Sequence, residues 1–156
     1  MHTIRLRGPW RYLFLSLILP DGSLVDEADQ LPPAGKLSIP GNTPWDPDYR
    51  GRVQLARRFH RPTGLVPDQQ VTLVVEWPGC EAEISLNGKL LGKLPSMNGL
   101  SRFSVGSLLQ PHNELLVAAE INPTSPAKMD ATVSGQSKHE NFMASTLPDI
   151  RLEIDG

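Results

Sequence analysis

The sequence predicts an all-β fold, a jelly-roll β-sandwich of two antiparallel sheets, on three observations. Short segments alternate apolar and polar residues with a period of two, which is the pattern of a strand with one buried face. The 15 prolines and 13 glycines are spread along the chain and separate these segments. Helical periodicity is almost absent. A chain of 156 residues is long enough for one core, so we expect a single domain over residues 1–156.

The clearest strands are at residues 71–77 and 81–87. In the first segment, one face carries four apolar residues: Val71, Leu73, Val75 and Trp77. The second segment alternates small or aliphatic residues with Glu81, Glu83 and a serine, so one of its faces is expected to be exposed to solvent. Both segments therefore predict strands of an antiparallel sheet.

Asn87-Gly88 follows directly and predicts a two-residue hairpin turn, because both residues tolerate a positive φ. Counting back from this turn, we expect Leu86 to face Lys89 and Ile84 to face Leu91.

Other segments follow the same rule, and one stretch allows a single helical turn closed by Pro111. The strands are expected at residues 36–39, 53–59, 103–105, 115–121 and 150–154, and the helical turn at 105–109.

Residues 5–22 allow two interpretations. Three arginines precede the apolar run at residues 12–19, which is how a secretory signal peptide begins. A buried strand that ends in the Pro20-Asp21-Gly22 turn would look similar. No cleavage pattern of small residues follows the run, so we interpret it as a core strand. The run is also far shorter than the ~20 residues that a transmembrane helix requires.

The composition and the absence of known motifs exclude several classes of function. The chain has 15 basic and 17 acidic residues without a basic block, so we expect neither nucleic acid nor a membrane as a partner. No motif of a nucleotide or cofactor site occurs, and we expect no cofactor. The pair His139-Glu140 lacks a second ligand at metal spacing and indicates a solvated loop rather than a metal site. Cys80 is unpaired, which favours a cytoplasmic location, and it indicates a buried or edge thiol rather than a nucleophile.

Two stretches lack the alternating pattern of a strand and are predicted to be loops. Residues 122–148 are mostly polar, and a loop of that length is typical of a functional or docked segment. Residues 40–51 carry Trp45 and Tyr49 beside Asp46 and Asp48. Aromatic rings among carboxylates suit a sugar, whose C–H face stacks on a ring while its hydroxyls form hydrogen bonds. The alternative is that both rings are buried and close one end of the sandwich.

Arg57 lies on the apolar face of its strand, between Leu55 and Phe59. A buried arginine is costly unless it is paired, so a bulge or a buried ion pair is one explanation. The other is that Arg57 lines a polar groove. Our candidate carbohydrate site therefore comprises Trp45, Tyr49 and Arg57, with Asn98 and His139 from neighbouring loops.

Four stretches together resemble the N-terminal sugar-binding domain of glycoside hydrolase family 2, the β-galactosidase and β-glucuronidase group. The closing LPDIRLEI (147–154) is similar to the final strand of that domain. The four stretches are GPW with its apolar strand (8–19), IPG…DYRGRVQLARRFHRP (39–62), AEISLNGKLLGKL (82–94) and FSVGSLLQPHNELLVAAEI (103–121).

The resemblance implies a galactose-binding-like jelly roll without an active site, because the catalytic glutamates of the family lie on a separate barrel domain. Most matching motif residues are structural, and only Arg57 transfers as a functional polar group. The motif residues are Gly51, Val53, Arg57, Phe59 and Pro62, then Leu86, Asn87, Gly88 and Gly92, then Leu109, Asn113, Leu115 and Val117.

The leading hypothesis is a non-catalytic carbohydrate-binding module whose ligand is unknown. The alternative is a protein-interaction or subunit module on the same fold, which docks through residues 122–148 and binds no sugar. Rings of Trp45 and Tyr49 that border an open concave patch would favour a sugar. Buried rings beside a large apolar surface would favour a protein.

Overall fold

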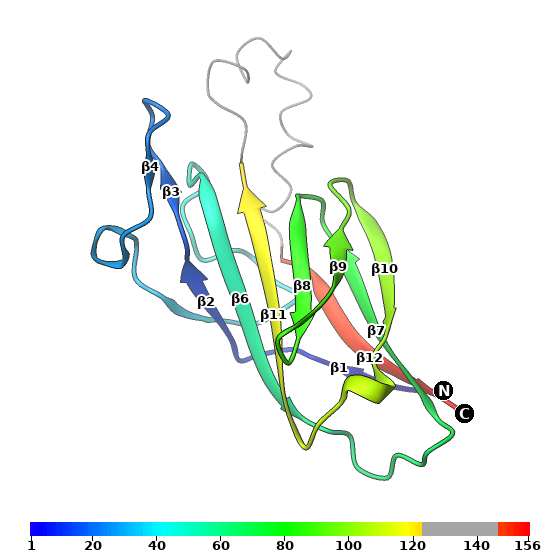
Figure 1. Cartoon of the computed structure of the whole chain (residues 1–156). Coiled ribbons are helices and arrows are strands. Elements are labelled where there is room, and N and C mark those ends of the chain that lie inside the picture. Colours follow the sequence, from blue (N-terminus) through cyan, green and yellow to red (C-terminus); the bar gives the residue numbers. More distant parts are fainter. Residues whose placement is uncertain (123–146) are drawn as a thin grey trace.

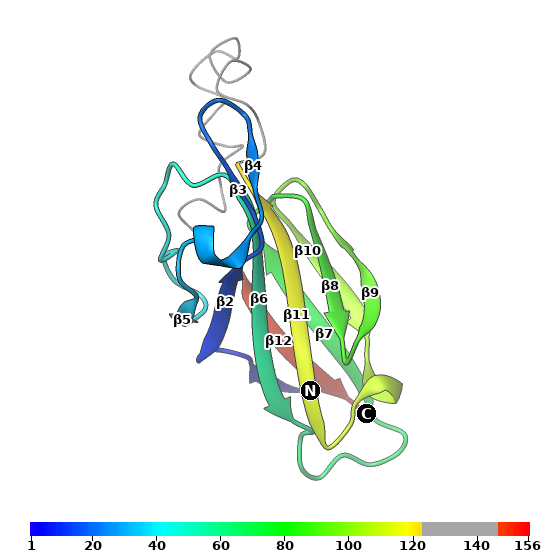
Figure 2. The same ribbon diagram turned by 60° about the vertical axis from the view of Figure 1, so that its left-hand side comes forward.

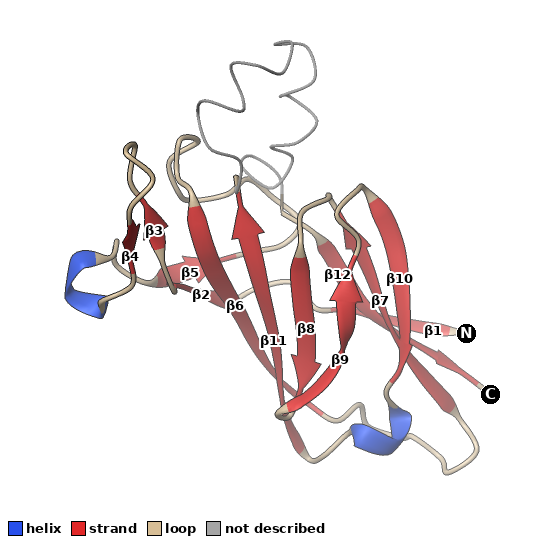
Figure 3. Ribbon diagram, turned by 45° about the horizontal axis from the view of Figure 1, so that its top comes forward, coloured by secondary structure: helices blue, strands red, loops and turns tan. Residues whose placement is uncertain are grey.

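The computed structural model describes residues 1–122 and 147–156, and these form two large antiparallel sheets packed as a β-sandwich (Figures 1 and 2). The six-stranded sheet has the order β5-β2-β6-β11-β8-β9, and the four-stranded sheet has the order β1-β12-β7-β10. A small sheet of β3 and β4 extends beyond the larger one (Figure 3). The predicted all-β sandwich is therefore confirmed.

Most strands agree with the alternating segments of the sequence, but β1 and β4 were not predicted, and β10 begins earlier than the expected strand at 103–105. The described residues also contain two short 3-10 turns, η1 and η2, the second within the expected helical turn. No helix in the described ranges is long and apolar enough to cross a membrane. The elements are β1 (His2–Arg5), β2 (Trp10–Phe14), β3 (Leu17–Ile18), β4 (Leu24–Val25), η1 (Ala28–Gln30), β5 (Gly35–Leu37), β6 (Gly51–His60), β7 (Gln70–Trp77), β8 (Ala82–Leu86), β9 (Lys89–Leu94), β10 (Gly99–Ser104), η2 (Gly106–Leu108), β11 (His112–Ile121) and β12 (Asp149–Asp155).

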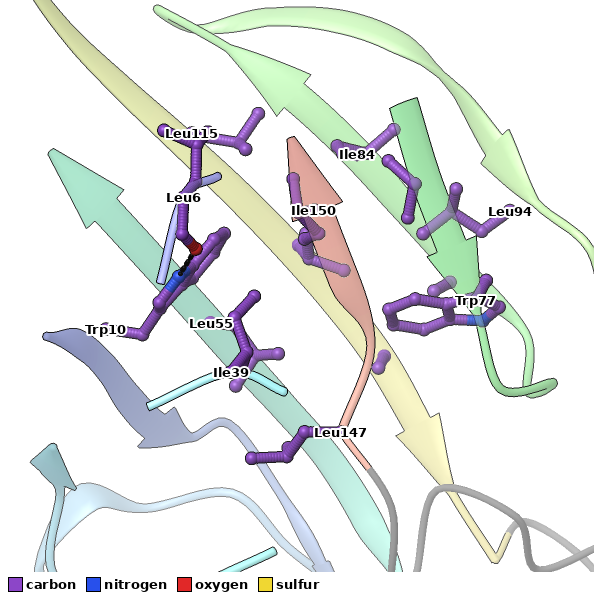
Figure 4. Close-up of a cluster of buried hydrophobic side chains, with 14 of the residues drawn as sticks. Leu6, Trp10, Ile39, Leu55, Trp77, Ile84, Leu94, Leu115, Leu147 and Ile150 are labelled. Atoms are coloured by element: carbon purple, nitrogen blue, oxygen red, sulfur yellow. Dashed lines mark hydrogen bonds between the residues drawn. The ribbon is translucent and has the colours of Figure 1, made fainter. Parts of the chain in front are cut away.

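The core lies between the two sheets and is anchored by two tryptophans that are fully buried (Figure 4). The Trp10 indole Nε1–H donates to the Leu6 carbonyl at 2.7 Å, and the Trp77 Nε1–H donates to the Cys80 carbonyl at 2.8 Å. Each ring therefore buries a large apolar surface while its polar atom keeps a partner. Fully buried aliphatic residues from both sheets surround them, among them Leu55, Ile84, Leu115 and Ile150.

The apolar run near the N-terminus is part of the sandwich, as expected, but as two short strands rather than one. β2 ends at Phe14, because the Leu15 and Ser16 N–H groups both point to the Arg52 carbonyl, at 2.8 and 3.3 Å. The run continues in β3, which turns back into β4 through a turn with Gly22 at φ 88°.

The predicted hairpin of β8 and β9 is confirmed at its turn and corrected further along. Leu86 faces Lys89 as expected, but Ile84 faces Gly92 and not Leu91. A β-bulge between Ile84 and Ser85 inserts Leu91 as an extra residue in β9.

The turn residue Asn87 also connects three strands. Its φ is 52°, which asparagine tolerates, and its Nδ2 donates to Asn113 Oδ1 at 2.9 Å. The Glu114 N–H donates to Asn87 Oδ1 at 2.8 Å, and Asn113 closes its own loop with two bonds to Gln110, each 2.8 Å long. Two of the motif asparagines are therefore structural.

The strand register determines which loops meet at each end of the sandwich. Ile121 pairs with Gly51, Ala119 with Ala82, and Ala82 in turn with Leu94. The loop that precedes β6 therefore shares one end with the loop between β9 and β10 (Figure 3).

Candidate functional site

A cleft of about 440 Å³ lies beside β2, at the end of the sandwich where β6 begins. β2 places Tyr12 and Phe14 on its inner face, and the loop before β6 lays Trp45 and Tyr49 against them. The volume is within the ~300–1,000 Å³ that is typical of small-molecule sites. The lining residues are Tyr12, Phe14, Leu17, Pro32, Pro33, Pro44, Trp45, Asp46, Asp48 and Tyr49.

Tyr49 and Gly51 hold the loop that precedes β6 in place. The Tyr49 hydroxyl donates to the Ser16 carbonyl at 2.5 Å and lies 3.0 Å from the Arg52 carbonyl. A Cβ atom on Gly51, whose φ is 153°, would lie 2.2 Å from the Ser16 carbonyl oxygen. The glycine of the family motif is therefore required for close approach of two backbones, and the Tyr49 hydroxyl is occupied in holding the loop.

The four rings form one edge-to-face cluster. The centroid of Trp45 is 6.0 Å from that of Tyr12 and 6.2 Å from that of Phe14, and Phe14 and Tyr49 are 4.9 Å apart. Trp45 and Tyr49 are 7% and 6% exposed, whereas Tyr12 is half-buried. The rings of Trp45 and Tyr49 are thus both packed at the end of the sandwich and part of the wall of a cleft. Burial also raises the pKa of Tyr49 above the usual range for a phenol.

Three buried polar atoms near the cleft have no hydrogen-bond partner within the described residues. They are Trp45 Nε1, one terminal nitrogen of Arg50 and Asn122 Oδ1. The Arg50 Nε–H donates to the Asn122 carbonyl at 3.2 Å, and Asn122 Nδ2 donates to the Tyr49 carbonyl at 2.8 Å. Buried polar groups are almost always paired in native proteins, so these three atoms are exceptions among the described residues.

Arg57 lies away from the cleft. It is six residues further along β6 than Gly51, which corresponds to about 20 Å of strand. Its side chain is half-buried, its Nε–H donates to the Arg7 carbonyl at 3.2 Å, and it also contacts the Arg58 carbonyl. The inward position is thus satisfied by backbone oxygens, without an ion pair in the described residues and without a bulge.

The other two candidate residues are not brought to the cleft. Asn98 is exposed in the loop between β9 and β10, at the same end of the sandwich but at the opposite edge of the six-stranded sheet (Figure 1). His139 lies outside the described residues, as does most of the predicted docking segment.

A second cleft, of about 500 Å³, lies near the other end of β6, and most of the residues that line it are polar. Its Asn87 and Asn113 are used in the network that holds the turn. Its Glu114 carboxylate lies 3.4 Å from both Arg11 and Arg58. These groups are engaged with each other, so this cleft is a weaker candidate for a binding site.

The described residues contain no arrangement typical of nucleophilic or metal chemistry. Cys80 is buried, and this burial raises the pKa of its thiol to about 12, the opposite of what an activated nucleophile requires. No group of three or more His, Cys, Asp or Glu side chains in the described ranges is placed to hold a metal ion.

Sequence reasoning missed the contribution of β2 and of the prolines at 32, 33 and 44 to the cleft. Tyr12 alternates with exposed residues in the pattern of a core strand, and only the loop that folds onto it turns it into part of a cleft wall. The carboxylates beside Trp45 were visible in the sequence as Asp46 and Asp48.

Comparison with known proteins supports the fold. No family model and no curated protein sequence matches this chain. Among solved structures, the β-glucuronidase of Bifidobacterium dentium in complex with coumarin-3-O-glucuronide is similar over 99% of this chain and 30% of its own, with 21% identity and a TM-score of 0.63. The Faecalibacterium prausnitzii β-glucuronidase is similar over 97% and 31%, with 18% identity and a TM-score of 0.63. The β-D-mannosidase of Dictyoglomus thermophilum is similar over 98% and 22%, with 15% identity and a TM-score of 0.62.

The chain spans less than a third of the length of each of these enzymes. At identities this low, the similarity concerns the fold. The resemblance seen in the sequence motifs is thus confirmed at that level: the chain has the β-sandwich fold of the N-terminal sugar-binding domain of glycoside hydrolase family 2 enzymes.

Proposed function

We propose that this chain is a non-catalytic carbohydrate-binding module whose ligand occupies the cleft beside Trp45. The observation that carries the proposal is the composition of the cleft, which combines aromatic rings on its wall with carboxylates at its rim. Rings offer an apolar face to the C–H groups of a pyranose, and carboxylate oxygens accept hydrogen bonds from its hydroxyls. Tyr12 is the most accessible of the three rings that carry a polar atom, so it is the stacking surface in this proposal.

The structure gives Tyr49 and Arg57 different roles from those expected for direct ligand contacts. The Tyr49 hydroxyl is bonded to the Ser16 backbone, so Tyr49 supplies a wall and holds the loop. Arg57 is bonded to carbonyl oxygens some distance away, so we assign it to the fold rather than to the ligand.

A non-catalytic role is supported by two further facts. The 156 residues match 22–31% of the length of the similar enzymes. The thiol of Cys80 is buried, and its pKa is raised rather than lowered.

A glycan array followed by calorimetry tests the proposal. Neighbouring positions of β2 provide a matched pair, because Tyr12 faces the cleft and Leu13 faces the opposite side. Tyr12→Ala is expected to weaken binding of the sugar identified on the array by roughly tenfold, the effect of losing about 1.4 kcal/mol of ring contact. Leu13→Ala is expected to leave the affinity unchanged. Thermal unfolding of both variants checks that each is folded, and absence of any sugar binding at millimolar concentrations rejects the proposal.

The alternative, a protein-docking module, is favoured by a different observation. The rings of Trp45 and Tyr49 are largely buried, and the similar enzymes carry this fold as part of a longer chain. Sedimentation over a range of concentrations tests whether the partner is a second copy of this chain. Self-association that Leu13→Glu abolishes would support docking through the outer face of the six-stranded sheet, where Leu13 is 46% exposed.

A further inference from the structure

We propose that the cleft beside Trp45 selects its sugar by charge, and that it prefers amino sugars with a free, protonated amine to neutral sugars and excludes uronic acids. This inference rests on the proposed carbohydrate-binding function and adds the substrate class to it.

The charges on the cleft are of one sign. Among the residues that the structure describes, Asp46 and Asp48 are the only charged ones that line it, and no described Lys, Arg or His does. Both aspartates are exposed, and neither forms an ion pair with any described residue. This differs from the second cleft, where Glu114 lies beside Arg11 and Arg58. Within the described part of the chain, the rim beside Trp45 therefore presents two carboxylates without a basic partner.

The local backbone fixes the Asp46 carboxylate and places Asp48 close to it in the chain. Asp46 Oδ1 accepts the Asp48 N–H at 2.8 Å, and the Asp46 carbonyl accepts the Tyr49 N–H at 2.9 Å. This turn keeps Asp46 and Asp48 on either side of Pro47, directly after Trp45. The second oxygen of Asp46 and both oxygens of Asp48 have no hydrogen-bond partner within the described residues, so they are available to a ligand.

An ammonium group suits this combination of charge and rings. A cation is attracted both to a carboxylate and to the face of an aromatic ring, and Tyr12, Trp45 and Tyr49 all line the same cleft. The carboxylate of a uronic acid would lie beside two negative charges without a basic residue to receive it. A neutral sugar would bind without either effect.

Three β-1,4-linked tetramers that differ in charge test this proposal with the full chain: fully deacetylated chitotetraose, cellotetraose and its oxidised uronic acid counterpart. Calorimetry at low salt and mildly acidic pH is expected to give roughly three- to tenfold tighter binding of chitotetraose than of cellotetraose, the effect of one or two exposed ion pairs. The uronic tetramer is expected to bind most weakly. Added salt is expected to reduce the preference, because it screens exposed charges.

The double variant Asp46→Asn, Asp48→Asn is expected to bind chitotetraose and cellotetraose equally. Asparagine at position 46 retains the side-chain oxygen that accepts the Asp48 N–H, so the turn is preserved. Asp26→Asn with Glu27→Gln is the matched control: it removes the same charge from exposed residues that do not line this cleft, and the preference is expected to persist.

The outcomes separate this inference from the proposed function. Tighter binding of chitotetraose that the double variant abolishes supports charge selection. Cellotetraose or the uronic tetramer binding as tightly as chitotetraose overturns it, while the module remains a carbohydrate binder. If neither these tetramers nor any glycan on the array binds at millimolar concentrations, both proposals fail.

Discussion

Trp10 and Trp77 lie between the sheets, whereas Trp45 lies at the wall of a cleft, and the three indoles differ in what their N–H groups meet. The core pair donate to backbone carbonyls at 2.7 and 2.8 Å. Trp45 is also nine-tenths buried, yet its Nε1–H has no partner within the described residues. The same residue type therefore has two roles: two indoles complete the core between the sheets, and the third lines a cleft with an N–H that no described residue accepts.

Removing one tryptophan ring from the core and one from the cleft should give the largest difference in the free energy of unfolding. Trp77→Ala is expected to lower the free energy of unfolding by about 3–5 kcal/mol, as for other large buried aromatic residues. Trp45→Ala is expected to lower it by less, about 2 kcal/mol, because Trp45 packs at the end of the sandwich beside a cleft, where neighbouring side chains can move into the space that the ring leaves. Urea unfolding measures both values. Equal losses would show that Trp45 is a core residue like the other two.

A more conservative change isolates the indole N–H. Trp77→Phe leaves the buried Cys80 carbonyl without its donor, and we expect a loss of about 1–3 kcal/mol in the free energy of unfolding. Trp45→Phe removes an N–H group that has no partner among the described residues, so its cost is expected to stay below about 1 kcal/mol. Trp10→Phe is the control and should behave like Trp77→Phe, because its indole also donates to a backbone carbonyl. A cost for Trp45→Phe equal to the other two would reveal a hydrogen bond at Trp45.

Alkaline pH should weaken both regions, through different groups. Burial, followed by the charge of Glu120, raises the pKa of Cys80 to about 12, and burial raises the pKa of Tyr49. The folded chain therefore retains protons that the unfolded chain releases above pH ~8.5 for the thiol and ~10 for the phenol. The free energy of unfolding should be constant below these values and decrease as the pH rises towards 12.

Two variants assign this decrease to each region. Cys80→Ala is expected to remove the part that begins near pH 8.5, and Tyr49→Phe the part that begins near pH 10. Urea unfolding across this pH range measures the slope. A flat profile in the original chain, or rapid labelling of the folded Cys80 thiol, would contradict the burial of these groups.

Most of the strands could be predicted from the sequence, because period-two alternation reports burial on one face. β1 was missed for the same reason: it is an edge strand, and Ile4 is its only partly buried residue. The predicted partner of Ile84 on β9 was wrong, because counting from the turn does not show the β-bulge that shifts the register after Ser85. Local pattern thus gave the strands, while packing decided the register.

The candidate site was only partly predictable. The aromatic and acidic residues of the loop at 40–50 were visible as a group, because they are adjacent in sequence. Tyr12 joins them only through tertiary folding, more than thirty residues away. Arg57 looked exceptional because a sequence pattern does not show that the Arg7 and Arg58 carbonyl oxygens would accept its N–H groups.

The Asn87-Gly88 turn has a consequence for the chemical ageing of this protein. Asn87 uses its amide nitrogen to bond Asn113 Oδ1 and the Leu108 carbonyl, at 2.9 and 3.2 Å. Deamidation would replace this donor with a carboxylate oxygen, which can only accept. Two attractive contacts would then become oxygen–oxygen repulsions at the point where β8, β9 and β11 are joined. Loss of one ammonia molecule from this turn would therefore loosen three strands at once.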